Sequence, residues 1–341
     1  MNQPDNILTV RQLAVDFRMG RRTVHAVNDV SFDVGRGRVL GIVGESGCGK
    51  SVTAHSVLQL LPRNGSIAGG SIDYRPTPQE CLRLTSLARR DRRLRAIRGA
   101  DIAMVFQDPM SSLNPVYTIG DQILENLREH EKGLSRREAR ERVIELLGSL
   151  GIPSPEKRMK EYPHQFSGGM KQRVMIAIAM VCRPRLLIAD EPTTALDVTI
   201  QAQILALMKQ LQAQQGTSIV LITHNMGIVA EICDDVAVMY MGRVVECGTL
   251  EQVFSNPLHP YTQALLRSVP VLGMDKSAKL DSIPGATPDI DTVFTGCEFA
   301  DRCPYADDRC RGSFPHDVMA EPGHRVRCHR CQGTPWQPSE G

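Results

Sequence analysis

Residues 44–51, which read GESGCGKS, constrain the fold of this chain more than any other segment. They follow the apolar run RVLGIV and precede a helical pattern at residues 51–61. The glycines let backbone N–H groups close around an anion, and the helix directs the positive end of its dipole at it. In the pattern GxxxxGK[ST], the lysine neutralises phosphate charge and the hydroxyl ligates Mg²⁺. The predicted nucleotide ligands are therefore Gly44, Glu45, Ser46, Gly47, Cys48, Gly49, Lys50 and Ser51.

Apolar runs typical of buried strands alternate with helical patterns further along the chain. Residues 185–190 and 218–223 read as strands with a helix at 201–214 between them. Alternating runs at 8–33 predict antiparallel strands, and 112–182 predict a mostly helical insertion with a capping box at Ser135 and Glu138. The pattern predicts an α/β fold with a largely parallel sheet, an antiparallel β subdomain and a helical subdomain.

Composition excludes several classes of protein. The 341 residues are 42% hydrophobic, which excludes a disordered chain, and 40 Lys and Arg against 38 Asp and Glu leave a net charge of only +2. The longest apolar run, residues 174–182, is far shorter than the roughly 20 residues of a membrane-spanning helix. The start MNQPDNILTV lacks the features of a signal peptide. We expect a cytosolic chain that meets a membrane only through partner proteins.

Two adjacent acids end the apolar run LLIADE. An acid pair after a strand is, taken alone, most often a turn or a helix cap. Together with the phosphate-binding loop, it predicts Asp190 as a Mg²⁺ ligand and Glu191 as the general base that orients water. The arginine-rich residues 83–98 have no interleaved aromatic side chains and read as a solvated face rather than a nucleic-acid surface.

Four further motifs surround this acid pair in a fixed order. They are Gln107, the run FSGGMKQ at residues 166–172, the run ALD at 195–197, and His224. With the two motifs above, they resemble the ATPase subunits of ABC transporters over about residues 7–250. The resemblance implies a P-loop NTPase cassette with a RecA-like core. It also implies a head-to-tail dimer in which ATP lies between the phosphate loop of one subunit and the SGG turn of the other.

The resemblance also implies roles for single residues. Gln107 would contact Mg²⁺ and water, His224 would hold the γ phosphate beside Glu191, and Asp197 would form a contact across the dimer. Phe17 stands where the family stacks an aromatic ring on adenine, and an ordinary core position is equally open. The remaining contacts, to the nucleotide of the partner subunit, would come from Ser167, Gly168 and Gly169.

The last part of the chain narrows the resemblance. Residues 256–266 (NPLHPYTQALL), 283–285 (IPG) and 296–306, with 107–115 (QDPMSSLNP), are similar to the ATP-binding subunits of dipeptide and oligopeptide importers. This implies a nucleotide-binding domain at 1–255, with its helical subdomain at 112–182, and a small, irregular, Cys-rich extension at 256–341. The chain would bind and hydrolyse ATP at the cytoplasmic face of a bacterial inner membrane.

Its implied partners are two permeases, a paralogous second ATPase subunit and, indirectly, a solute-binding protein, with no nucleic acid. The solute stays open among dipeptides, longer peptides, nickel chelates and glutathione-like compounds. Two other classes stay open as well. One is a soluble ABC ATPase that acts on DNA or ribosomes, and the other is a redox or metal-sensing module that regulates an importer.

Five of the ten cysteines lie in the last 45 residues. Four of them, spaced C-x5-C-x6-C-x17-C, could ligate a [4Fe–4S] cluster or zinc. Zinc knuckles have short C-x2-4-C pairs, which the first three lack, and the resemblance implies a cluster. Zinc and unligated thiols stay open, and Cys331 could replace the fourth ligand. The predicted ligands are Cys297, Cys303, Cys310 and Cys328.

Overall fold

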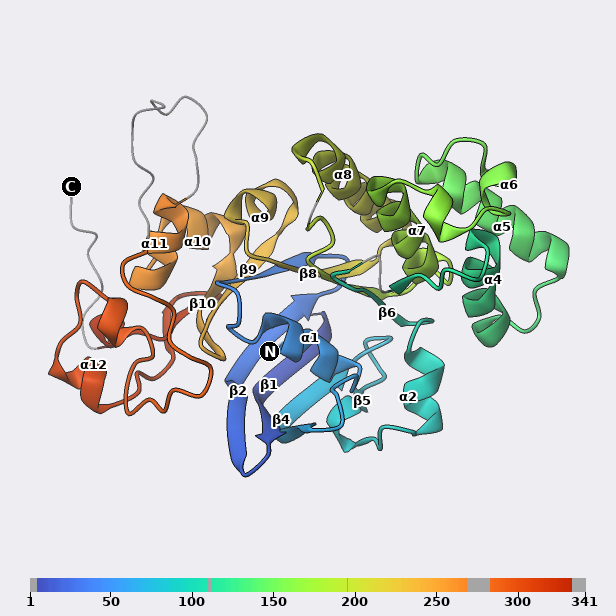
Figure 1. Ribbon diagram of the computed structural model, residues 1–341. Helices are drawn as coiled ribbons and strands as arrows, with labels where there is room; N and C mark the ends of the chain where they lie inside the picture. The colour runs from blue at the N-terminus through green and yellow to red at the C-terminus, as the bar shows by residue number, and fades with distance from the viewer. Residues whose placement is uncertain (1–4, 109–111, 195, 269–282, 333–341) are drawn as a thin grey trace. The chain divides into compact units, whose positions relative to one another are not determined.

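The computed structural model describes residues 5–108, 112–194, 196–268 and 283–332 (Figure 1). The chain divides into two compact units. The first unit comprises Met1–Ile7, Val34–Arg38 and Tyr74–Ile222, and the second comprises Leu8–Asp33, Val39–Asp73 and Thr223–Gly341.

A hairpin opens the second unit. β1 (Asn6–Met19) and β2 (Arg22–Gly35) are joined by a turn at Gly20 and Arg21, and β4 (Gly65–Tyr74) lies on the other side of β1. Such a short connection joins antiparallel strands, and the φ of +65° at Gly20 suits the tight turn. This hairpin confirms the strands predicted within residues 8–33.

The other sheet of the second unit is mixed and leads into the phosphate-binding loop. β3 (Val39–Val43) is fully buried and pairs in parallel with β9 (Asp235–Tyr240), which pairs antiparallel with β10 (Arg243–Thr249). A strand buried on both faces needs a continuous apolar sequence, as VLGIV provides. The helices of this unit are α1 (Lys50–Val57), α9 (Met226–Ile232), α10 (Leu250–Ser255), α11 (Pro260–Arg267) and α12 (Asp308–Gly312).

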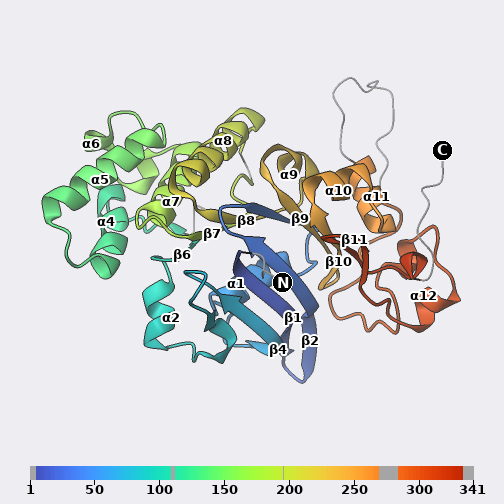
Figure 2. The same cartoon turned by 180° about the vertical axis from the view of Figure 1, so that it is seen from behind.

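The carboxy-terminal residues extend this mixed sheet. β12 (His324–Val326) pairs antiparallel with β10 and with β11 (Val318–Glu321), and Figure 2 shows β10 and β11 in the same region. The irregular, Cys-rich extension predicted from composition is therefore not supported. The prediction failed because two strands of three and four residues leave almost no periodic signal among prolines and cysteines. Pairing with β12 satisfies backbone groups that β10 would otherwise expose at a sheet edge.

The first unit contains three parallel strands. β6 (Ile102–Val105) pairs with β7 (Leu186–Asp190), and β7 pairs with β8 (Ser218–Thr223). Every residue of β7 and β8 is buried, and α8 (Val198–Gln215) connects the two strands. These elements confirm the predicted strands at 185–190 and 218–223 and the helix between them.

A group of helices, green in Figure 1, follows β6 in the same unit. Thr118, Ser135 and Ser167 begin three of the helices by accepting hydrogen bonds from backbone N–H groups, and Ser135 forms the predicted capping box with Glu138. The group confirms that residues 112–182 are mostly helical. It consists of α4 (Ile119–His130), α5 (Arg136–Ser149), α6 (Pro155–Arg158) and α7 (Gly168–Met180).

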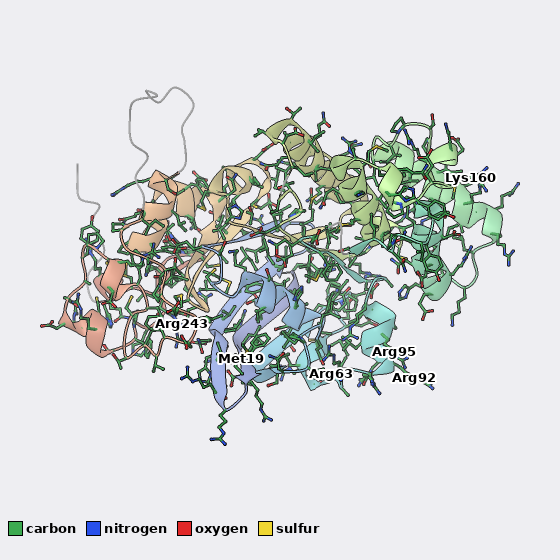
Figure 3. The ribbon with its side chains drawn as sticks, in the orientation of Figure 1. Met19, Arg63, Arg92, Arg95, Lys160 and Arg243 are labelled. Carbon is green, nitrogen blue, oxygen red and sulfur yellow. The ribbon has the colours of Figure 1, made fainter. Side chains whose placement is uncertain are left out.

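The arginine-rich segment lies between the short strand β5 (Leu82–Arg83) and β6. Its helix α2 (Arg92–Ile97) buries Leu94 and exposes Arg92 and Arg95, which Figure 3 labels. This arrangement matches a solvated face with one apolar anchor. Among the helices of the described residues, none is both long and apolar enough to cross a bilayer.

Candidate nucleotide site

The loop between β3 and α1 has the backbone conformation that its glycines predict. Gly44, Gly47 and Gly49 have φ values of 155°, 82° and 97°. A Cβ atom at Gly44 would lie 2.1 Å from the carbonyl oxygen of Met239, and one at Gly49 would lie 2.6 Å from that of Ala26. The loop can therefore follow this path only with glycine at both positions.

Lys50 directs its charge at this loop. Its side chain is 5% exposed, and its Nζ donates hydrogen bonds to the carbonyl oxygens of Gly44, at 2.7 Å, and Glu45, at 2.9 Å. Ser51 follows in the first turn of α1, whose amino-terminal end faces the same loop. Cys48 is buried beside Lys50, and burial raises the pKa of its thiol. The loop thus combines an ammonium group, a helix dipole and backbone N–H groups, as phosphate binding requires.

Phe17, the predicted adenine contact, lies in β1 and is half buried. Its ring packs over Gly65 of β4, where an added Cβ atom would approach its Cε1 to 2.8 Å. The packing orients the ring, and both interpretations of Phe17 remain predictions.

In the first unit, Gln107 and Glu191 lie together beyond the ends of β6 and β7. Gln107 Nε2 donates a hydrogen bond of 3.0 Å to Glu191 Oε2, and Thr194 Oγ1 donates one of 2.8 Å to the same oxygen. Glu191 has a φ of 46°, a strained conformation for a residue other than glycine, and its N–H bonds to the carbonyl oxygen of Ile222. This strain and the two donors orient the carboxylate that sequence reasoning chose as general base.

Asp190 and His224 also occupy the ends of strands. Asp190 is the last residue of β7 and is 2% exposed, so that its carboxylate is a buried anion of the kind that ligates Mg²⁺. His224 directly follows β8 and is exposed. The next residue, Asn225, accepts a hydrogen bond from Gly227 N–H and begins α9. The side-chain amide of Asn225 therefore serves as a helix cap.

The SGG turn begins α7 and lies against the start of α8. Ser167 accepts a hydrogen bond from Met170 N–H as the helix cap, and Gly168 is exposed. A Cβ atom at Gly169 would lie 2.8 Å from Cγ2 of Ile200. Asp197 caps α8 by accepting from Ile200 N–H at 2.9 Å. The structure thus brings together the SGG turn and the segment with Asp197. Ala195 and residues 109–111, which belong to two of the quoted motifs, lie outside the described residues.

Two residues near the carboxy terminus also reach the phosphate-binding loop, and sequence reasoning missed both. Arg302 forms an ion pair with Glu45, and Tyr261 Oη accepts a hydrogen bond of 2.8 Å from Glu45 N–H. His259 caps α11 by accepting a hydrogen bond from Tyr261 N–H. No short motif distinguishes an arginine between cysteines as a loop contact, so the sequence carried no signal for Arg302.

The predicted cysteine ligands all lie in the second unit. Burial raises the pKa of the Cys297 thiol to about 12 and also raises the pKa of Cys303 and Cys310. A hydrogen bond with Cys331 raises the pKa of Cys328.

Within residues 5–108, 112–194, 196–268 and 283–332, no group of three or more His, Cys, Asp or Glu side chains is arranged to hold a metal ion. The structure therefore does not support the predicted metal centre. Cys328 instead shares a hydrogen bond with Cys331, and neither cysteine forms a disulfide.

Two family models match the chain. The model described as "ABC transporter" matches residues 27–194, and the model described as "Oligopeptide/dipeptide transporter, C-terminal region" matches residues 245–310. The first match includes the phosphate-binding loop, the SGG turn and the acid pair. The second includes Tyr261 and Arg302.

Curated relatives match over nearly the whole chain. A putative peptide import ATP-binding protein of Brucella ovis is 51% identical over 332 residues, which cover 96% of this chain and 97% of the relative. The dipeptide transport ATP-binding protein DppD of Bacillus subtilis is 48% identical over 325 residues, which cover 95% and 94%.

A solved structure agrees with the fold. The dimeric, post-hydrolysis ATP-binding cassette MJ0796, bound to ADP and Pi, matches with a TM-score of 0.63 and 26% identity over 71% of this chain and 98% of that one. The chain therefore belongs to the ABC transporter ATPases, and within them to the family of peptide-import ATP-binding proteins.

Proposed function

We propose that this chain is the ATP-binding and ATP-hydrolysing subunit of a bacterial importer for dipeptides or oligopeptides. The observation that carries the proposal is the Glu191 carboxylate, which Gln107 and Thr194 orient beyond a buried parallel strand. The phosphate-binding loop, toward which Lys50 directs its ammonium group, supports the binding of ATP. The relatives named for peptide import support the class of solute.

The side chains divide the reaction between them. Ser51, Asp190 and Gln107 would hold Mg²⁺, which supplies charge neutralisation for the ATP phosphates when bound. Lys50 binds the phosphates, and Glu191 accepts a proton from the attacking water and orients it. His224 would stabilise the γ phosphate, and Phe17 would stack on adenine. The buried carboxylate of Asp190 and the hydroxyl of Ser51 are oxygen donors that suit Mg²⁺.

A second ATPase subunit would complete each nucleotide site. Ser167 caps α7, and Gly168 and Gly169 open its first turn. The N–H groups at the start of an α-helix have no acceptor within the helix, so this turn is suited to bind a γ phosphate. Asp197 would contact the partner subunit beside them. The pairing of this turn with the start of α8 supports a joint role in the dimer. We expect the partner to be a paralogue.

The same proposal extends to location and organisation. The chain would sit at the cytoplasmic face of the inner membrane, bound to two permeases that receive solute from a binding protein. Residues 1–255 would act as the cassette, with its helical subdomain at 112–182, and residues 256–341 as the importer-type extension. ATP would close the cassette dimer and hydrolysis would reopen it, so that the permeases alternate between two states.

Co-purification tests this proposal. The chain, tagged at its amino terminus, is extracted with membranes in mild detergent, and bound proteins are identified by mass spectrometry with and without Mg-ATP. We expect two multi-span permeases and a second ATPase. Recovery of the chain only in the aqueous fraction, with nucleic acid or ribosomes, would instead show that it is an ABC ATPase of another kind.

We further propose that the carboxy-terminal cysteines ligate a [4Fe–4S] cluster, as the resemblance implies. Support comes from their spacing alone, since no three such side chains of the described residues are arranged to hold a metal ion. No step of ATP hydrolysis depends on this proposal. Metal and acid-labile sulfide analysis after anaerobic purification should find about four irons per chain and absorption near roughly 400 nm. Zinc alone, or a preparation with neither iron nor acid-labile sulfide, would contradict it.

A further inference from the structure

The second residue of the phosphate-binding loop, Glu45, is an acid. The carboxy-terminal region, residues 256–268 and 283–332, neutralises it. Arg302 Nη1 lies 2.6 Å from Glu45 Oε2, and Arg302 Nη2 lies 3.0 Å from Glu45 Oε1. The guanidinium thus bonds both carboxylate oxygens at once, which fixes the orientation of the carboxylate as well as its charge. The Arg302 side chain is 5% exposed and that of Glu45 is 24% exposed, so the pair is largely shielded from solvent.

Other contacts hold Arg302 in place. Its Nε donates to the carbonyl oxygen of Pro284 at 2.9 Å, and its Nη1 also reaches Tyr240 Oη at 3.3 Å. The guanidinium carbon lies 5.8 Å from the ring centre of Tyr240 and 5.9 Å from that of Phe299. With every nitrogen of the guanidinium bonded, Arg302 has one position, and this position depends on the fold of the carboxy-terminal region.

A second contact fixes the backbone at the same residue. Glu45 N–H donates to Tyr261 Oη, and Tyr261 is completely buried in α11. Its ring packs against Tyr240, with 4.6 Å between ring centres, and against Phe299, at 5.3 Å. The side chain of Glu45 and its backbone N–H are therefore both held by residues that follow the cassette motifs in the sequence.

The same region also borders the space beside the loop. A cavity of about 230 Å³ is lined by Gly47 of the loop, by His25 of β2 and, from the carboxy-terminal region, by Thr292 and Phe314. Arg243 of β10, labelled in Figure 3, anchors this side, because it bonds Glu298 and lies over the ring of Phe314. The carboxy-terminal region thus contacts the phosphate-binding loop at Glu45 and also lines a cavity beside Gly47 of the same loop.

An unpaired carboxylate in this loop would repel the phosphates of a nucleotide, since two like charges a few ångströms apart and poorly solvated interact strongly. We propose that Arg302 and Tyr261 are positioning residues of the nucleotide site, through which the carboxy-terminal region sets the affinity for nucleotide. The inference rests on the proposed function only in taking residues 44–51 as the nucleotide-binding loop. It extends that function by making Tyr261 and Arg302, which follow the cassette motifs in the sequence, part of the site.

Calorimetric titration of the full-length chain with Mg-ADP, which is not hydrolysed, tests the inference. For Arg302→Ala we expect the Kd to rise roughly tenfold, or about 1.4 kcal/mol. In steady-state ATP hydrolysis, the same variant should show a raised KM and a kcat near that of the wild type. Arg309→Ala is the matched control, because Arg309 lies in the same region and forms only an exposed ion pair with Asp307. Its Kd should not change.

The double variant Glu45→Gln/Arg302→Ala separates a role in binding from a role in folding. Removing the acid should restore the Kd to within about threefold of the wild type if repulsion is the cause. Glu45→Gln alone should bind Mg-ADP as tightly as the wild type or more tightly, which gives a test even if Arg302→Ala fails to fold. Tyr261→Phe should weaken binding, because the loop loses the contact that fixes its backbone at Glu45. Lower thermal stability of Arg302→Ala with an unchanged Kd would overturn the inference, and so would a double variant no better than the single one.

Lys50→Ala distinguishes failure of this inference from failure of the proposed function. Lys50→Ala should lose nucleotide affinity whatever the role of Arg302. Full-strength binding by Lys50→Ala would overturn the assignment of the loop itself. Weak binding by Lys50→Ala together with normal binding by Arg302→Ala would overturn the inference alone.

Discussion

Gln107 and Glu191, which are 84 residues apart in the sequence, are joined by a hydrogen bond of 3.0 Å between Gln107 Nε2 and Glu191 Oε2. Each follows the end of one of two adjacent parallel strands, so the sheet places both side chains at the same edge. The bond leaves Glu191 oriented, and it links the proposed general base to the residue proposed to contact Mg²⁺ and water.

Thr194 should matter to the rate of hydrolysis although it carries no charge. Its hydroxyl donates a hydrogen bond of 2.8 Å to Glu191 Oε2, the oxygen that Gln107 also contacts. Thr194→Val removes this bond and would allow the carboxylate to turn. We expect kcat to fall roughly tenfold, about the value of one hydrogen bond to a charged group, with KM unchanged. Steady-state ATP hydrolysis measures this. Thr199→Val, at an exposed position of α8, is the control, and an equal effect of both substitutions would contradict the role of Thr194.

Gly169 should be required for stability, because the side chain of Ile200 leaves no room for a Cβ atom at this position. A methyl group at Gly169→Ala would meet Cγ2 of Ile200 at 2.8 Å, and a β-branched side chain has little freedom to turn away. We expect Gly169→Ala to lower the free energy of unfolding by about 1–3 kcal/mol. Thermal unfolding measures the loss. The double variant Gly169→Ala/Ile200→Ala should recover part of it, and a double variant with additive losses would show that the clash is not the cause.

Glu246 should be among the most important residues for stability. Its fully buried carboxylate accepts hydrogen bonds from Leu258 N–H, His259 N–H and His324 Nε2, all between 2.8 and 2.9 Å. Glu246→Gln would leave a mismatched amide among these groups, at a cost of about 3 kcal/mol. Urea unfolding should show this loss, whereas Glu145→Gln, on the exposed side of α5, should show almost none. Similar midpoints for the two variants would contradict the prediction.

The ion pair of His324 predicts a pH dependence. Burial lowers the pKa of His324, but hydrogen bonds to Glu246 and Glu321 outweigh it and raise the pKa above 6.5. A raised pKa in the folded state gives a stabilisation that is complete below pH 6.5 and is lost as the pH rises through the folded-state pKa. The stability difference between wild type and His324→Gln should therefore be larger at about pH 6 than at about pH 8.5. A difference that grows toward alkaline pH would contradict the prediction.

Much of the fold and of the site could be predicted because local signals and global topology agree. The glycines of the phosphate-binding loop and the apolar run before Asp190 each require one backbone environment, and both were found there. The bond between Thr194 and Glu191 could not be predicted, because a hydroxyl three residues after an acid occurs in many turns.

The carboxy-terminal region was harder to predict for a physical reason. β11 and β12 are too short to show a period of two residues, and their pairing with β10 joins segments about 80 residues apart. Arg302 contacts Glu45 across 257 residues, a separation over which no local pattern carries information. Composition suggested an appendage, whereas the contacts of Glu246 and Glu45 join the region to the sheet and to the loop.

We propose that Glu191 acts on water while the phosphate-binding loop binds nucleotide independently of it. The most direct test compares ATP binding and ATP hydrolysis in the wild type and in Glu191→Gln, which keeps the shape of the side chain and removes its basic group. We expect unchanged ATP affinity and hydrolysis slowed by about 10²–10⁴-fold, the usual contribution of a general base. Hydrolysis by Glu191→Gln at the wild-type rate would contradict the account.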